Sequence, residues 1–259
     1  MGYRTRKSPH VVRKNKNERS KNMFTYKGIK SNDMHLRVLN DISFTSPTRD
    51  VNVVQVPGRD GDLIMDNGRY NSVIRSVPCR LEAPDDVNIE HLANRINNWL
   101  IDDGRFHEFS WSNDPDFKYL ARVEGDVSSS RMLSRLGRTV IDFRLHPVKY
   151  LRSSLEAREV ASGIVLSNQF EIDAKPMIRI VGGGDITLHI GGRPLVLHGI
   201  SEGCVIDSET QTITDLQGRV TLFERMRSPF PILRPGFNQV LFFRDDIQVF
   251  ITPRLGALV

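Results

Sequence analysis

Apolar and polar residues alternate along most of this 259-residue chain. Between residues 34 and 82 the pattern is clear. Val51 and Val53 would lie on one face of a strand, and Val54 and Val56 on the other. A period of two, interrupted by Gly, Asp and Asn, predicts antiparallel strands joined by turns. We therefore expect a mainly β protein.

Turn residues divide this first region. Two residues after Gly58, the Asp60-Gly61 pair predicts a hairpin turn, because Asp-Gly tolerates the positive φ that tight hairpin turns require. Residues 66–68, Asp-Asn-Gly, predict a second corner. The hairpin expected over residues 51–77 is apolar on both faces. It either reaches a neighbouring subunit or lies inside a sheet, and the sequence leaves both interpretations open.

One segment has a helical period instead. Its apolar residues recur at three- and four-residue steps, which predicts a stripe that packs on the neighbouring sheet. Asp85 or Asp86 is expected to cap the helix, and Gly104 to end it. The stripe consists of Ile89, Leu92, Ile96, Trp99 and Leu100.

The last third of the chain predicts short strands with stiff turns between them. Turn residues expected there are Pro235, Gly236, Asn238 and Pro253. Seven short strands in this spacing are typical of a jelly-roll or galectin-like sandwich. The expected strands are 177–181, 186–190, 194–197, 204–207, 211–214, 239–243 and 247–251.

Three segments follow from these patterns. Polar and charged residues accumulate between 150 and 160, which predicts a domain boundary there. We expect a β-rich domain with one helix over residues 23–150 and a galectin-like sandwich over residues 151–259. Residues 1–22 are polar and without apolar periodicity, so they are expected to form a flexible arm.

Basic residues are concentrated in that arm. Residues 1–22 contain eight Lys or Arg and one acid, a net charge of +7, whereas the whole chain carries +5. The remaining residues therefore sum to −2, which argues against a nucleic-acid-binding face on the folded part. Three interpretations of the arm stay open. It is an extension upstream of the true start or an expression artefact, or it is a segment that orders on a partner. The third interpretation is that it contacts nucleic acid through its charge.

Removal of residues 1–22 is expected to leave the melting temperature unchanged, because this segment offers no apolar burial to the folded protein. Thermal unfolding of the truncated chain beside the full chain tests this. A large fall in melting temperature would contradict the arm assignment.

Bulk features exclude several classes of protein. No run approaches the ~18 apolar residues that a membrane span needs, and no apolar stretch follows the basic amino terminus as in a signal peptide. The two cysteines, Cys79 and Cys204, lie far apart and in no ligand-like spacing. We expect both to be reduced, buried residues of a protein made in a cytosol.

Residues that could carry chemistry are scattered. The run 182–184, Gly-Gly-Gly, lacks the Lys-Ser/Thr of a phosphate loop, so a hairpin turn is expected there. His189 and His198 have no third ligand nearby, and Leu63 breaks the rhythm of a calcium loop after Asp60 and Asp62. A dispersed Ser-His-Asp triad stays open, although no Gly-x-Ser-x-Gly supports it. We predict no catalytic, cofactor-binding or metal site.

Two groups of segments resemble phage distal tail proteins of the siphophage type, over residues 23 to 256. The likeness departs near residues 213–214, where the family has a Tyr, and at 244–246, where it has a Gly-containing turn. The matching segments are 24–28 (Phe-Thr-Tyr-Lys-Gly), 56–62 (Val-Pro-Gly-Arg-Asp-Gly-Asp), 206–209 (Ile-Asp-Ser-Glu), 235–238 (Pro-Gly-Phe-Asn) and 251–254 (Ile-Thr-Pro-Arg).

The resemblance implies a structural protein without enzymatic activity or cofactor. It implies a homo-hexameric ring with an open channel at the tail tip of the virion, synthesised in the host cytoplasm. Expected partners are the tail tube protein, a tail-associated fibre or lysin protein, and a receptor-binding or baseplate protein. DNA would only pass through the channel, and no membrane is bound. The alternative is a carbohydrate-binding adhesion module, which the lack of Trp and Tyr in residues 151–259 disfavours.

Overall fold

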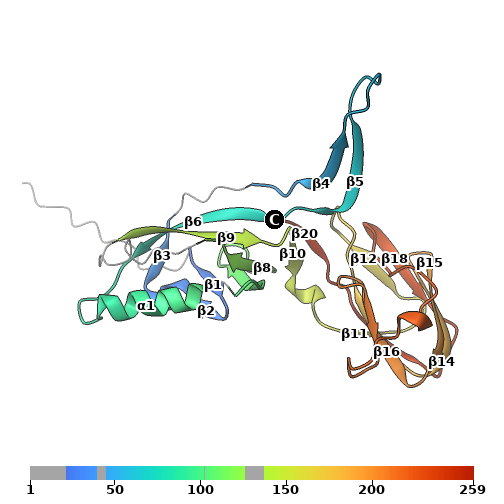
Figure 1. Ribbon diagram of the computed structural model, residues 1–259. Helices are drawn as coiled ribbons and strands as arrows, with labels where there is room; N and C mark the ends of the chain where they lie inside the picture. Colours follow the sequence, from blue (N-terminus) through green and yellow to red (C-terminus); the bar gives the residue numbers. More distant parts are fainter. Residues whose placement is uncertain (1–21, 40–44, 102, 126–136) are drawn as a thin grey trace, which may run out of the picture.

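The computed structural model describes residues 22–39, 45–101, 103–125 and 137–259. Its first part is a nine-stranded sheet in the order β2-β1-β7-β8-β9-β6-β3, with β10 pairing with β8 and β20. We call this the sheet module (Figure 1). Its strands are β1 (Phe24–Tyr26), β2 (Ile29–Lys30), β3 (Leu36–Val38), β6 (Val73–Leu81), β7 (His107–Trp111), β8 (Phe117–Val123), β9 (Arg138–Leu145), β10 (Val148–Leu151) and β20 (Gly256–Leu258).

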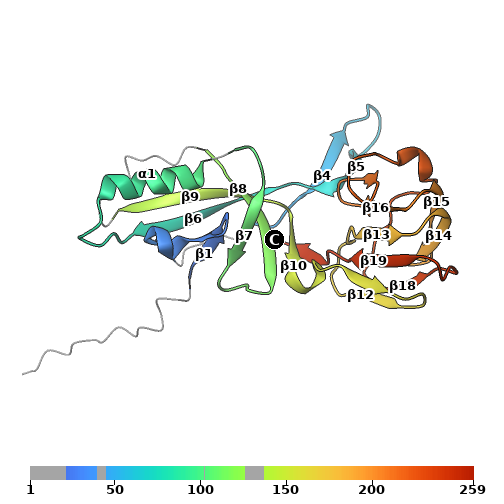
Figure 2. The same cartoon turned by 90° about the horizontal axis from the view of Figure 1, so that it is seen from below.

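Helix α1 (Ile89–Leu100) covers one face of this sheet (Figures 1 and 2). The predicted apolar stripe is confirmed, because Leu92, Ile96 and Trp99 are all buried in the core. The predicted caps are wrong. Asn88 is the N-cap, and its side chain accepts hydrogen bonds from the backbone N–H groups of residues 90 and 91 at 3.0 and 3.1 Å. Asp85 and Asp86 lie before this N-cap, and the helix ends at Leu100 with Ile101 as its C-cap, ahead of the predicted Gly104.

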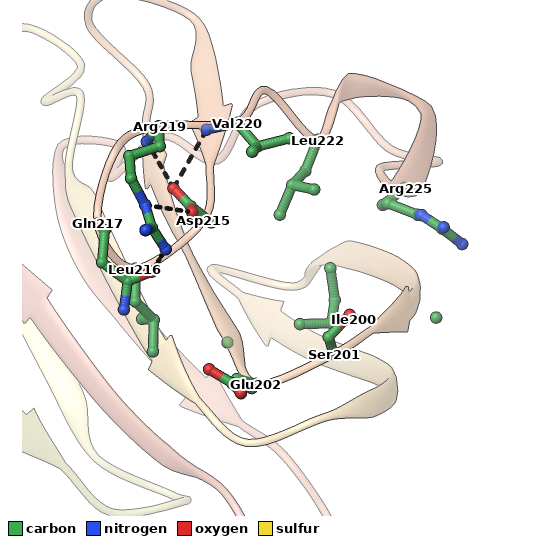
Figure 3. A pocket seen from close by; sticks show the side chains of 12 residues that line it. Ile200, Ser201, Glu202, Asp215, Leu216, Gln217, Arg219, Val220, Leu222 and Arg225 are labelled. Atoms are coloured by element: carbon green, nitrogen blue, oxygen red, sulfur yellow. Dashed lines mark hydrogen bonds and ion pairs between the residues drawn. The ribbon is translucent and has the colours of Figure 1, made fainter.

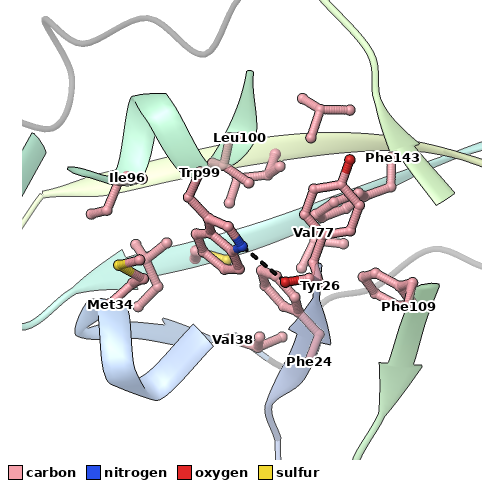
Figure 4. Packing of buried hydrophobic residues seen from close by; sticks show 14 of the residues in the cluster. Phe24, Tyr26, Met34, Val38, Val77, Ile96, Trp99, Leu100, Phe109 and Phe143 are labelled. Atoms are coloured by element: carbon pink, nitrogen blue, oxygen red, sulfur yellow. Dashed lines mark hydrogen bonds between the residues drawn. The ribbon is translucent and has the colours of Figure 1, made fainter. Parts of the chain in front are cut away.

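Aromatic rings fill the space between α1 and the sheet (Figure 4). Phe24 stacks on Trp99 and on Phe109, with ring centroids 5.7 and 5.5 Å apart. The Trp99 indole N–H donates to the Tyr26 carbonyl oxygen at 2.9 Å, which satisfies the one polar group of that side chain. The first strand is thereby fixed to the helix.

The second part of the chain is a two-sheet sandwich, which we call the sandwich module. One sheet has the order β11-β19-β13-β16-β17 and the other β12-β18-β14-β15. All seven strands predicted from the sequence are present, with ends shifted by up to three residues. The strands are β11 (Arg158–Val160), β12 (Val165–Asn168), β13 (Met177–Val181), β14 (Gly184–Ile190), β15 (Arg193–Ile200), β16 (Gly203–Asp207), β17 (Thr212–Thr214), β18 (Gly236–Leu241) and β19 (Gln248–Thr252).

The glycine run 182–184 has a different role from the one predicted. It connects β13 with β14, which belong to different sheets, so it is a crossing between the two layers and no hairpin turn. A Cβ atom on Gly183 would lie 2.3 Å from the Ser201 carbonyl oxygen. Glycine is required there because two backbone segments meet.

The two modules have separate cores, and their junction carries polar contacts. The Tyr150 hydroxyl of β10 donates to the Glu209 carboxylate of the sandwich module, and Arg254 pairs with Asp207 at 2.6 Å. Burial by itself would raise the pKa of Asp207, but hydrogen bonds from Arg254 and from backbone N–H groups hold it below its usual value.

The end of the chain returns to the sheet module. β20 pairs with β10, with Leu258 opposite Val148. Residues 256–258 therefore extend the first sheet, although the sequence placed them in the second domain. No helix in the described part of the chain has the length and apolar character needed to cross a bilayer.

Candidate functional site

A hairpin of β4 (Arg49–Val54) and β5 (Leu63–Tyr70) projects from the body of the molecule (Figure 1). Among the described strands, β4 and β5 pair only with each other. The chain enters β6 directly after β5, so the hairpin is attached at the end of the nine-stranded sheet. No other two described strands form a separate two-stranded sheet.

Both faces of the hairpin are apolar and exposed. Val53 lies opposite Ile64 on one face, and their exposed fractions are 56% and 66%. Met65, half exposed, lies on the other face. The hairpin ends at residue 70, whereas residues 73–77 of the predicted hairpin belong to β6, inside the nine-stranded sheet. A sheet interior is therefore wrong for residues 49–70 of the single chain and right for residues 73–77. The exposed apolar residues are Val51, Val53, Val54, Val56, Ile64 and Met65.

Charged pairs hold the base of the hairpin. Arg49 on β4 donates to both oxygens of Asp66 on β5 at 3.0 and 2.9 Å, and its guanidinium lies 4.7 Å from the centre of the Tyr70 ring. The pKa of Asp66 lies below its usual value because Arg49 and the Gly68 N–H donate to its carboxylate. These pairs set the register but, being exposed, add little stability.

The predicted turn residues Gly58, Asp60 and Gly61 lie at the tip of this hairpin. Residues 55–62 connect the two strands, and Gly58 and Gly61 have φ values of +80° and +77°. The second predicted corner, at residues 66–68, is wrong. It lies inside β5, where Gly68 has φ +74° and the pairing shifts by two residues between Arg49, opposite Tyr70, and Val51, opposite Asp66. This is a bulge, which increases strand twist.

The other predicted turn residues lie at two corners of the sandwich module. Pro235 and Gly236 precede and open β18, and Pro253 follows β19. Asn238 is buried, and its side chain accepts from Arg234 N at 3.0 Å and donates to Arg234 O at 2.8 Å. The asparagine thus acts as an internal clamp of the corner, a role that the sequence motif alone did not indicate.

Replacing Gly236 by Val is expected to destabilise the sandwich module. Gly236 has φ +93°, and a Cβ atom added there would meet no other atom within 4 Å, so the cost is backbone strain of roughly 1–3 kcal/mol. The melting temperature measures it. The matched control is Phe237→Val, at the next position, which is exposed. Equal melting temperatures for the two variants would contradict the strain.

The side chains considered as possible metal ligands or nucleophiles do not lie together in the described structure. His189 lies opposite Pro194, far along β15 from His198, and His198 instead faces Asp185 at 3.3 Å. Within the described residues no three His, Cys, Asp or Glu side chains form a group that could hold a metal. Burial raises the pKa of both the Cys79 and Cys204 thiols to about 12, so neither is an activated nucleophile.

A shallow hollow of about 270 Å³ lies on the sandwich module (Figure 3). It is formed by the turn 199–203 and the segment 215–225. The Asp215 carboxylate at its side already accepts hydrogen bonds from the backbone N–H groups of Arg219 and Val220. Asp215 is therefore used to hold its own loop, Glu202 is the other acid of the lining, and the lining contains no His, Cys or Tyr.

Comparison with known proteins gives a likeness in structure only. No family model and no curated protein matches the sequence. The structure is similar to the crystal structure of the Dit protein of phage SPP1, with a TM-score of 0.66 and 15% identity, over 89% of this chain and 98% of that chain. The baseplate of phage p2 matches with a TM-score of 0.48 and 10% identity, over 89% and 97%.

SPP1 Dit is described as a paradigm of the hub adsorption apparatus in phages that infect Gram-positive bacteria. Its likeness extends over both modules of this chain. The predicted fold class is confirmed: a mainly β protein, with a β-rich first part carrying the one helix of the described residues, followed by a galectin-like sandwich. This chain has the fold of a siphophage distal tail protein, as its sequence resemblance predicted.

Proposed function

We propose that this chain is a structural protein of the tip of a long, non-contractile phage tail, where six copies form the ring of a baseplate hub. The fold supports the tail assignment. The observation that best supports a ring is the β4–β5 hairpin, which exposes apolar side chains on both faces. It has the form of an element that is completed only by a second subunit.

Two physical arguments connect the hairpin with a ring. An isolated two-stranded hairpin is marginally stable in water, so its apolar faces need a cover. The described body of the chain does not supply one, since the apolar side chains on both faces stay exposed. If the hairpin of each subunit lies on a different surface of the next, the contact is heterologous, and such contacts close into a ring when the rotation between neighbours closes.

The proposed partners follow from a place at the tail tip. One side of the ring would contact the tail tube protein and the other a tail-associated fibre or lysin protein. The sandwich module would hold a receptor-binding or baseplate protein. DNA would pass through the ring without sequence recognition, in keeping with the net charge of −2 outside the basic arm. No enzymatic step and no membrane contact are part of this role.

Native mass measurement and negative-stain electron microscopy of the purified full chain test the proposal. We expect six-fold rings, or a monomer that forms them when the tail tube protein is added. A monomer that stays alone at high concentration and never binds tube protein would count against the hub. Glycan binding by the full chain without any ring would favour the alternative, a carbohydrate-binding adhesion module.

A further inference from the structure

Strand β12 is an open edge of the sandwich module. It pairs with β18 on one side, with Ser167 opposite Phe237. On its other side no described strand lies next to it. The two strands form one margin of the sandwich (Figure 2).

Backbone groups of β12 point out from this edge. Val240 N donates to Ile164 O at 2.8 Å, so the backbone of Ile164 faces β18. In an antiparallel ladder every second residue faces the same partner strand, so the backbone N–H and C=O of Leu166 face β18 as well. The N–H and C=O groups of Val165 and Ser167 then point away from the sheet. Neither residue has a backbone hydrogen bond to any described residue beyond that strand pair.

The remaining sheet edges of the described chain are protected against strand addition. β15 is covered by the segment after Phe223, through a bridge from Leu197 to Met226, and β17 is bridged at Thr214 to Thr221. β11 carries charged side chains, as do both hairpin strands, and β2, β3 and β20 have two or three residues. Charge, cover and shortness are the devices that prevent edge pairing. β12 has four residues, and residues 161–170 around it contain no charged residue.

The outer face beside this edge suits an apolar strand. Val165 and Phe237 lie on it, with exposed fractions of 50% and 84%. Gln239 and Leu241 follow along β18, and His189 and Thr187 on β14. The acid on this face of β14, Asp185, lies at the far end of the strand, where it faces His198. A neighbouring strand would place every second side chain against Val165 and Phe237.

We propose that β12 is a docking edge that adds an extended segment of a partner protein as a fifth strand of the sheet. The segment has apolar side chains at alternate positions, which pack beside Phe237 and Val165. Main-chain hydrogen bonds to Val165 and Ser167 supply the affinity, as in other cases of strand addition. The site does not depend on a ring: it can be occupied in a monomer or in a hexamer.

The probe is an immobilised library of blocked decapeptides in which Val, Ile, Leu or Phe alternates with Ser or Thr. The full chain is compared with Ser167→Pro, which removes an outward N–H without removing a bond to β18, and with the matched control Ser167→Thr. We expect wild type and S167T to retain the same peptides, and S167P to bind them about tenfold or more weakly. Hydrogen exchange of residues 162–169 should slow by at least about tenfold with peptide bound.

Val165→Lys is the second variant, in case S167P fails to fold, because it places a charge on the edge without backbone strain. It should also lose the peptides while keeping the wild-type melting temperature. The proposal would be overturned if neither variant weakens the peptide binding seen with the wild type, or if the wild type binds no peptide. If hydrogen exchange at residues 162–169 slows with protein concentration alone, a second copy of this chain occupies the edge, and the proposal of a partner segment is equally overturned. If the protein binds the peptides but forms no ring, the proposed ring is refuted and the docking edge at β12 is supported.

Discussion

Changing Val53 and Ile64 together to lysine should break the proposed ring into monomers. These two side chains lie opposite each other at the outer half of the hairpin. Losing the burial of each costs about 1.5–3 kcal/mol, before the cost of burying two charges. Association should therefore weaken by about 100-fold or more. Analytical ultracentrifugation over a range of concentrations measures the change.

The control for this variant is Val220→Lys, at a residue of the sandwich module that is as exposed as Val53, at 56%. It should leave the ring intact. The melting temperature of the double variant should stay close to that of the wild type, because the hairpin lies outside both cores. A double variant that still forms rings would show that the hairpin is not the contact.

Replacing Phe24 by alanine should have the largest effect on stability. Phe24 is fully buried, and its ring contacts Trp99, Phe109 and Phe143. A large-to-small change of this kind leaves a cavity and costs about 3–5 kcal/mol. The sheet module should lose its helix contact and melt roughly 10 °C earlier, as measured by calorimetry.

The matched control is Phe237→Ala, the same chemical change at a side chain that is 84% exposed. It should alter the melting temperature little, because almost no apolar area is lost from the interior. The sandwich module has its own core, so in Phe24→Ala its unfolding transition should stay at the wild-type temperature. Equal losses in the two variants would contradict the position of Phe24 in the core.

Local periodicity predicted most elements. The stripe of α1 could be read from the sequence because a helix returns one face every three to four residues, and the strands of the sandwich because their burial alternates. Trp99 was expected in the core for the same reason. The run 128–131, Ser-Ser-Ser-Arg, is typical of an exposed loop by composition and lies outside the described residues, as do residues 1–21.

One error is local, and the others concern contacts between distant segments. Asp86 and Asn88 are equally good caps by residue type, and only the path of the chain before α1 selects Asn88. The glycines 182–184 favour any turn, and whether the turn stays in one sheet depends on where β15 and β19 lie. The pairing of β20 with β10 joins residues more than 100 positions apart, which no local pattern encodes.

By itself, the sequence determined seven of the nine strands of the sandwich module, the helix α1 and the family that they resemble, because these depend on local periodicity, turn chemistry and motif order. It did not predict β11 and β12. Only the tertiary structure decided that the apolar faces of residues 49–70 are uncovered and that β12 is an open edge. An alternating strand has the same sequence pattern whether its neighbour is present or missing. Exposure is a property of the assembled neighbours, so the two surfaces on which the proposals rest appear only after the chain has folded.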